Sequence, residues 1–164
     1  MRWHERIRRR LPDKERLRKT ILYRLFGNNI LAGDLWHFDA RSVAAGWSMG
    51  LFIALTPTIP FQMTLACIGA LSLRVNLPMA LLACWVTNPL TSVPFYMAAW
   101  RLGRAVLDAI PFAHEYVCAY GEGTRSKVIV GSFCLWTGCL ILAAAALVVS
   151  YPLVRWLWPR QGEE

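Results

Sequence analysis

Charged residues are missing from three long stretches of this 164-residue chain, residues 42–73, 75–100 and 128–154. Each stretch is longer than the roughly 20 apolar residues that an α-helix needs to cross a bilayer. Over the whole chain 17% of residues are charged and 56% are hydrophobic, whereas soluble domains contain about 25% charged and roughly 45–50% apolar residues. This pattern excludes an ordinary soluble domain and predicts an integral membrane protein.

Histidine and carboxylate side chains are absent from residues 42–100, where the only ionisable groups are Arg74, Cys67, Cys84 and Tyr96. Acid–base and nucleophilic catalysis need a titratable group beside the reacting atom. Transition metals need a cluster of imidazole, thiolate or carboxylate ligands. We therefore predict that the protein is not an enzyme, has no catalytic residues and holds neither a metal nor a cofactor.

A cysteine framework and a secretory signal are also missing. The five cysteines form no C-x-x-C pair, and four of them lie in apolar sequence. This arrangement favours packing over disulfide formation or metal binding. No apolar run follows the first arginines directly, so a signal peptide is not predicted.

Positive charge is concentrated at the N-terminus. Residues 1–24 contain ten Lys or Arg and three Asp or Glu, a net charge of +7 out of +8 for the whole chain. Such a cluster can bind nucleic acid, but beside membrane sequence it favours an anchor on anionic lipid and a cytoplasmic N-terminus. Within it, residues 13–26 place their apolar side chains on one helical face, which is typical of an amphipathic helix at the membrane surface.

Prolines interrupt the first uncharged stretch. As one straight helix, residues 42–73 would be about 48 Å long, against a hydrocarbon core of about 30 Å. Pro57 and Pro60 each remove a backbone donor and clash with the preceding turn. The helix is therefore expected to break near Thr56–Pro60 and to turn back, which returns Arg74 to the side of the membrane on which the stretch begins. The alternative is a kinked crossing, which would place Arg74 on the other side.

The second uncharged stretch repeats this arrangement. Asn88-Pro89 interrupts residues 75–100, and Pro94 allows a second arm to begin. The motif P-F-x-M occurs in both stretches at an offset of 34 residues, which indicates either a duplication or a chance match. Proline-broken segments at corresponding positions mark the substrate site in transporters built from repeats.

The predicted fold is an all-α integral membrane protein with two proline-broken, re-entrant-like helical hairpins, one C-terminal transmembrane helix and a basic amphipathic N-terminal helix. The transmembrane helix is expected over residues 128–150, ending at Tyr151-Pro152 before the aromatic and basic anchor RWLWPR. The expected segments are a basic cytoplasmic or interfacial segment (1–33), a membrane core with two broken-helix units (34–104), an interfacial helix and loop (105–127), and the transmembrane helix with its anchor (128–158).

Two uncommon motifs lie in the membrane core, R-x-N-x-P at 74–78 and N-P-L-T at 88–91. They are accompanied by Trp36, Ser42, Gly46, Gly50, Phe52, Thr56-Pro57, Pro60-x-Gln62, Pro94, Tyr96 and Gly103. Together these residues resemble the prokaryotic membrane-protein family catalogued as domain of unknown function 2062, over about two-fifths of the chain. The resemblance implies a bacterial inner-membrane protein without an established activity, whose related domains occur beside glycosyltransferase-like modules.

Polar side chains gather around the two expected breaks. They can pair with backbone groups that the prolines leave without partners, or they can bind a substrate, and both interpretations stay open. Arg74 lies between the two units and has the planar geometry that suits phosphate or carboxylate, or it marks the cytoplasmic interface. The polar residues at the breaks are Thr56, Thr58, Gln62, Thr64, Thr87, Asn88, Thr91 and Ser92. The candidate substrate-binding residues are Arg74, Asn76, Asn88, Thr91, Gln62 and Thr56.

These features predict recognition or translocation of an anionic substrate such as a polyprenyl-phosphate-like lipid. The architecture looks similar to that of the DedA-like lipid-phosphate transporters, although their acidic membrane residues have no counterpart here. The alternative function is a non-transporting membrane adaptor or anchor for an envelope-synthesis enzyme. The expected partners are membrane lipids with anionic headgroups, together with a second copy of the chain or such an enzyme, and no nucleic acid. The expected location is the bacterial inner membrane, with several passes and a cytoplasmic N-terminus.

Overall fold

The computed structural model describes residue 27, residues 33–111 and residues 124–158. In these ranges the chain forms five α-helices and no strand, which confirms the all-α prediction. The expected amphipathic helix over residues 13–26 lies outside them. The elements are a 3-10 turn η2 (Gly33–Trp36) and the helices α4 (Ala40–Leu55), α5 (Gln62–Leu73), α6 (Leu77–Cys84), α7 (Pro89–Ala109) and α9 (Thr124–Leu157).

Helices α4 and α5 form an antiparallel pair. Asp39 caps α4, because its carboxylate accepts hydrogen bonds from the backbone N–H groups at the start of the helix. Helix α4 ends at Leu55, and the chain reverses before α5 begins at Gln62. Arg74, which follows α5, therefore lines the same pocket as Asp39 and Arg41. The break expected from the prolines occurs, and Arg74 returns to the end of the molecule at which α4 begins.

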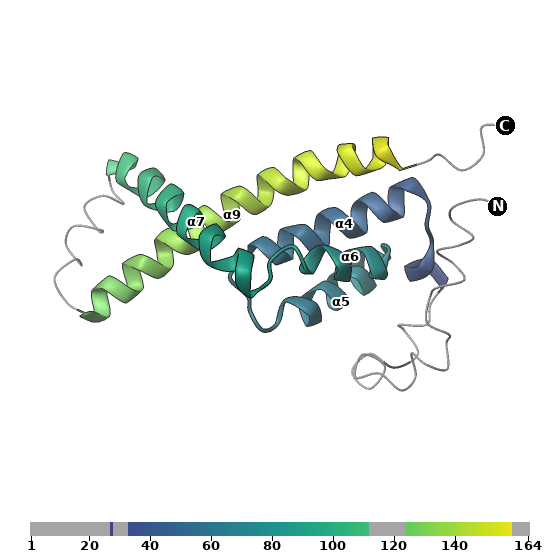
Figure 1. The fold of residues 1–164 in the computed structure, drawn as a ribbon, viewed down its shortest axis with the longest axis horizontal. Helices are drawn as coiled ribbons and strands as arrows, with labels where there is room; N and C mark the ends of the chain where they lie inside the picture. The colour runs from purple at the N-terminus through teal and green to yellow at the C-terminus, as the bar shows by residue number, and fades with distance from the viewer. Residues whose placement is uncertain (1–26, 28–32, 112–123, 159–164) are drawn as a thin grey trace.

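The second unit differs from the predicted hairpin, because α6 and α7 follow one another in the same direction (Figure 1). Helix α6 runs parallel to α4, since Cys84 Sγ lies 3.8 Å from the Gly50 carbonyl oxygen and the Thr87 hydroxyl donates to the Ala54 carbonyl oxygen at 2.9 Å. Helix α7 then packs across α9, beyond the end of α4. The second unit is thus one broken passage through the molecule.

Proline placement explains this difference. Pro89 is the first residue of α7, where a missing N–H costs nothing because the first turn has no intrahelical acceptor. Pro94 lies inside α7. It removes one backbone hydrogen bond in the second turn and does not end the helix, so it does not begin a new arm as the sequence suggested.

Helix α9 is the longest element, with 34 residues and a length of about 51 Å. It continues through Pro152, beyond the predicted end of the apolar helix. Its residues Lys127–Leu157 are long and apolar enough to cross a membrane, and no other helix among the described residues meets both criteria. Helix α9 runs antiparallel to α4, because the Ser150 hydroxyl donates to the Ser48 hydroxyl at 3.0 Å and the Trp158 indole, just after α9, donates to the Phe38 carbonyl oxygen, just before α4, at 3.0 Å. It also crosses α7 (Figure 1).

Small residues allow the helices to approach closely. A methyl group added at Gly50 would overlap the Ala80 carbonyl oxygen across the α4–α6 contact. Gly103 and Gly138 play the same part between α7 and α9, where an added methyl group would overlap the backbone of the opposite helix. The four cysteines in the described ranges are free and buried, as expected of packing residues.

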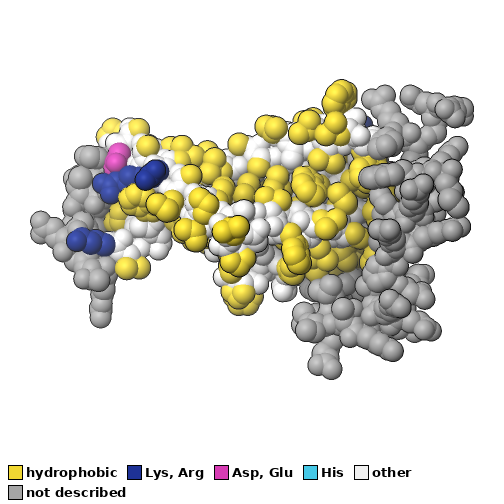
Figure 2. All heavy atoms as spheres, viewed as in Figure 1, with side chains coloured by type: hydrophobic (Ala, Val, Ile, Leu, Met, Phe, Trp, Pro, Cys, Tyr) yellow, Lys and Arg dark blue, Asp and Glu magenta, His cyan; other side chains and the backbone are white. Residues whose placement is uncertain are grey.

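The molecule has two charged ends and an apolar body. The proximal end, as we call it, carries Asp39, Arg41, Arg74 and Arg155, at the start of α4 and the end of α9. The distal end carries Arg101, Arg104 and Asp108 at the end of α7, and Lys127 at the start of α9. Figure 2 shows hydrophobic side chains over the body between the ends, and basic side chains gathered at the distal end.

Candidate functional site

The six candidate residues form three groups, two of which are neighbours at the far end of α4. Thr56 and Gln62 lie at the turn between α4 and α5, whereas Asn88 and Thr91 lie at the start of α7. Arg74 and Asn76 lie at the proximal end, which is separated from the turn by the length of the 16-residue α4, about 24 Å. The structure therefore does not bring the six residues together in one pocket.

At the turn, buried polar side chains bind the last carbonyl groups of α4. The Gln62 amide donates to the Ala54 carbonyl oxygen at 3.3 Å, and the Thr87 hydroxyl donates to the same oxygen at 2.9 Å. The Thr56 hydroxyl donates to the Ile53 carbonyl oxygen at 2.7 Å. The final carbonyl groups of a helix have no intrahelical donor, and in an apolar environment each must find a partner. These side chains therefore complete the end of α4.

Thr87, in the α6–α7 break, and Tyr96, in α7, also belong to this hydrogen-bonded cluster, although neither was among the six candidates. Thr87 also contacts Gln62, whose amide nitrogen lies 3.3 Å from the Thr87 hydroxyl. The Tyr96 hydroxyl donates to the Thr56 carbonyl oxygen at 3.4 Å. The cluster thus joins the α4–α5 turn to the α6–α7 break. Thr87 lies 25 residues after Gln62, and Tyr96 lies 40 residues after Thr56. No local sequence pattern indicates contacts at these separations.

Asn88 and Thr91 form a capping box at the start of α7. The Asn88 side-chain oxygen accepts hydrogen bonds from the Leu90 and Thr91 N–H groups at 2.9 and 3.1 Å. In return the Thr91 hydroxyl accepts from the Asn88 N–H at 3.0 Å and donates to the Val86 carbonyl oxygen at 2.8 Å. Both side chains use their polar atoms to begin α7.

Asn76 is fully buried and joins three segments of the chain. Its side-chain oxygen accepts from the Met79 N–H at 2.9 Å and so caps α6, while its amide donates to the His37 carbonyl oxygen at 2.6 Å. Its backbone N–H donates to the Ser42 carbonyl oxygen at 3.3 Å. Asn76 therefore fixes the chain immediately after Arg74.

A pocket of about 480 Å³ opens at the proximal end beside Arg74. Arg74 adopts left-handed backbone angles, φ 52° and ψ 47°, and is the only residue other than glycine with positive φ in the described ranges. Glycine is the usual residue in this conformation at a helix end, and strained positions of this kind gather at functional sites. The pocket is lined by Asp39, Arg41, Ser42, Ala45, Leu73, Arg74, Val75 and Tyr151.

Two further features of this proximal pocket were not predicted. Arg41 lines it together with Arg74, and its guanidinium group makes no hydrogen bond or ion pair with any described residue. The Ser42 hydroxyl oxygen is buried and has no hydrogen-bond partner among the residues that the structure describes. Such a group usually marks a site for a ligand or an ordered water. The Asp39 carboxylate is engaged at the start of α4. The pocket lining thus brings two arginine residues and a hydroxyl group together, a combination whose chemistry suits an anion.

Comparison with known proteins gives one match. A family model described as an uncharacterized protein conserved in bacteria (DUF2062) matches residues 23–163. This confirms the resemblance that the core motifs indicated and extends it on both sides of the core. No curated protein and no solved structure matches the chain.

Proposed function

The chain belongs to the DUF2062 family of uncharacterized bacterial proteins, and we propose that it is a multi-pass inner-membrane protein that recognises the anionic headgroup of a lipid-linked substrate. A polyprenyl phosphate has the chemistry that the proximal pocket suits. The proposed role is binding or translocation, not catalysis. The observation that carries the proposal is the pairing of Arg41 and Arg74 in one pocket beside the unpartnered Ser42 hydroxyl.

Several features support placement in a membrane. Lys127–Leu157 can cross a bilayer by length and composition. Ser48 on α4 lies beside Ser150 on α9, because their hydroxyl groups form a hydrogen bond. Helix α4 ends seven residues after Ser48, about 10 Å farther along its axis. The α4–α5 turn is therefore level with about residue 143 of α9, close to the middle of the uncharged stretch 128–154. In this placement α4 and α5 enter the membrane to half its depth and return.

Charge supports an orientation with the proximal end in the cytoplasm. Residues 1–24 precede α4 and carry a net charge of +7. Residues 101–127, which include the distal end, contain four Lys or Arg and three Asp or Glu, a net charge of +1. Basic segments near membrane helices stay in the cytoplasm. The proximal pocket would then face the leaflet from which newly made lipid-linked precursors are drawn.

Labelling of single cysteines tests this orientation. The native Cys67, Cys84, Cys134 and Cys139 are buried, so the background needs only Cys118→Ser. In intact cells, a maleimide that cannot cross membranes is expected to label Ala109→Cys at the end of α7 and to leave Leu73→Cys at the end of α5 unlabelled. After the cells are opened, both should react. Labelling of Leu73→Cys in intact cells would contradict the orientation, and labelling of both Leu73→Cys and Ala109→Cys would also contradict the half-depth turn.

Lipid retention tests the proximal pocket. Native mass spectrometry of the purified wild type is expected to show a bound anionic lipid with a phosphate headgroup. Arg41→Gln and Arg74→Gln should each lower its occupancy about tenfold or more, because a charge-assisted hydrogen bond contributes about 1.5–3 kcal/mol. Arg74→Gly should lower it equally, and glycine adopts the left-handed conformation of this position without strain.

The matched control for the pocket is Arg155→Gln, which removes a cation from the proximal end but not from the pocket lining. Its bound lipids should equal those of the wild type. If Arg41→Gln and Arg74→Gln insert normally and keep the wild-type lipids, the headgroup site is wrong. A membrane adaptor for an envelope-synthesis enzyme then becomes the better proposal.

A further inference from the structure

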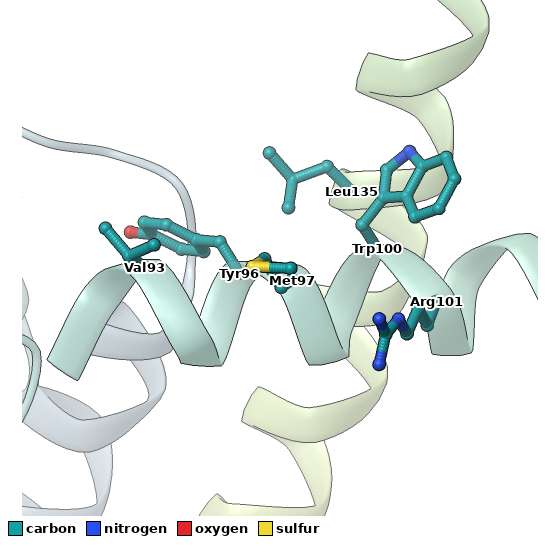
Figure 3. Close-up of a pocket in the computed structure, with 6 residues that line it drawn as sticks. All are labelled: Val93, Tyr96, Met97, Trp100, Arg101 and Leu135. Carbon is teal, nitrogen blue, oxygen red and sulfur yellow. The ribbon is translucent and has the colours of Figure 1, made fainter.

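A second pocket, of about 510 Å³, lies between α7 and α9 in the distal half of the molecule. It is an open groove on the apolar body. Figure 3 shows Val93, Tyr96, Met97 and Trp100 along α7, with Leu135 facing them from α9 and Arg101 at one end of the row. None of these residues belongs to the proximal pocket.

The groove has the length and surface of a lipid chain site. Val93, Met97, Trp100 and Arg101 are spaced as one stripe on a helix. Val93 and Met97 expose 61% and 55% of their surface although they are large and apolar. From Val93 to Arg101 the helix rises about 12 Å at 1.5 Å per residue, close to the roughly 15 Å that makes up half of the hydrocarbon core.

The groove also ends at a cation that has no internal partner. The guanidinium group of Arg101 forms no hydrogen bond or ion pair with any residue that the structure describes. One turn later, Arg104 pairs with Asp108 at 3.0 Å. The acidic side chain at this end of α7 is thus already bound, and Arg101 can turn to a phosphate at the membrane surface.

We propose that this groove binds an anionic phospholipid of the distal leaflet, with one chain along Val93, Met97 and Trp100 and the phosphate at Arg101. The inference rests on the membrane placement proposed above but uses no residue of the proximal pocket. Charge complementarity at Arg101 favours a lipid over a second copy of the chain, because no carboxylate lines the groove to meet that cation in a symmetric pair. The protein then has one anionic-lipid site in each leaflet.

Photo-crosslinking tests the distal site. The full-length protein is placed in phosphatidylcholine nanodiscs that contain a small fraction of diazirine-labelled phosphatidylglycerol or, separately, diazirine-labelled phosphatidylcholine. Adducts are located by peptide mass spectrometry. We expect phosphatidylglycerol to label residues 93–101 at least fivefold more than phosphatidylcholine does.

Two groove variants separate the headgroup from the chain. Arg101→Gln should bring the two lipids to equal labelling, whereas Lys127→Gln, which removes another distal cation, should keep the preference. Met97→Trp should lower labelling by both lipids because it fills the groove. The side chains of Arg101 and Met97 are exposed, so both groove variants should retain the fold.

Three results would overturn the distal site. The first is equal labelling by the two lipids in the wild type, and the second is an unchanged preference in Arg101→Gln. The third is the absence of lipid adducts together with crosslinks between residues 93–101 of two chains, which would make the groove an interface between copies. Arg74→Gln should leave the groove adducts unchanged. If only the proximal site is wrong, Arg74→Gln will therefore show both wild-type groove labelling and wild-type lipid retention.

Discussion

Gly103→Ala is expected to cause one of the largest losses of stability of any single methyl addition in this protein. The new methyl group would overlap the Cys134 carbonyl oxygen of α9 and would also lie only 2.7 Å from the backbone nitrogen of Gly138. Overpacking usually costs about 1–3 kcal/mol and occasionally more. Here the obstacle is backbone, which cannot rotate aside as a side chain can, so about 3 kcal/mol or more is expected.

The measurement is the apparent melting temperature of purified protein in detergent. A loss of about 3 kcal/mol corresponds to a decrease of roughly 6–12 °C for a chain of this size. Gly138→Ala should behave in the same way, because its added methyl group would overlap the Ala99 carbonyl oxygen from the opposite side of the same contact.

Gly131→Ala is the matched control within α9. The nearest atom to its added methyl group is the Trp100 indole nitrogen at 3.8 Å, an ordinary contact distance. Alanine favours helix over glycine by about 0.8–1.0 kcal/mol, so this variant should melt at the wild-type temperature or above it. If Gly103→Ala and Gly131→Ala melt alike, α7 and α9 do not pack as described.

Local chemistry made the helix boundaries of the first unit predictable. Pro57 and Pro60 cannot continue a helix, and a straight helix over residues 42–73 would be too long for the bilayer. The break follows from these two facts. The return of Arg74 was the favoured of two arrangements, the other being a kinked crossing. The family was also predictable, because R-x-N-x-P and N-P-L-T are local motifs.

The direction of the second unit was not predictable, because Pro89 is compatible with two arrangements. It can open the second arm of a hairpin or the next part of a broken passage, since the first turn of a helix tolerates proline in both. The choice depends on tertiary contacts, among them Cys84 with Gly50 and Thr87 with Ala54, which hold α6 parallel to α4.

The sequence could not predict which site residues lie together, for a similar reason. Arg74 was chosen for its chemistry, but its neighbours Arg41 and Tyr151 come from helices 33 residues before it and 77 residues after it. Gln62 and Thr56 were chosen as polar groups near a break, and what they bind is the end of α4. The sequence shows which groups need partners, but only packing decides which partners they find.

Asn76→Ala is expected to be the second severe substitution, because it removes two side-chain hydrogen bonds from a fully buried position. The Met79 N–H would lose its cap, and the His37 carbonyl oxygen would lose its donor at 2.6 Å. Each buried group left without a partner costs about 1–3 kcal/mol. The expected loss is therefore about 2–6 kcal/mol, and the variant should accumulate poorly in the membrane or melt far below the wild type.

Asn76→Ser separates the two contributions. Serine is a good N-cap, so it should keep the bond to Met79 while losing the bond to His37, and its melting temperature should lie between those of the wild type and Asn76→Ala. Asn76 follows Arg74 by two residues, and its hydrogen bonds to Met79 and His37 hold the backbone on which that arginine sits. Asn76→Ser should therefore insert normally yet retain less anionic lipid than the wild type, by native mass spectrometry at matched protein amounts. Wild-type melting in both variants would show that Asn76 does not anchor α6, and wild-type lipid retention in Asn76→Ser would show that the proximal pocket does not depend on this anchor.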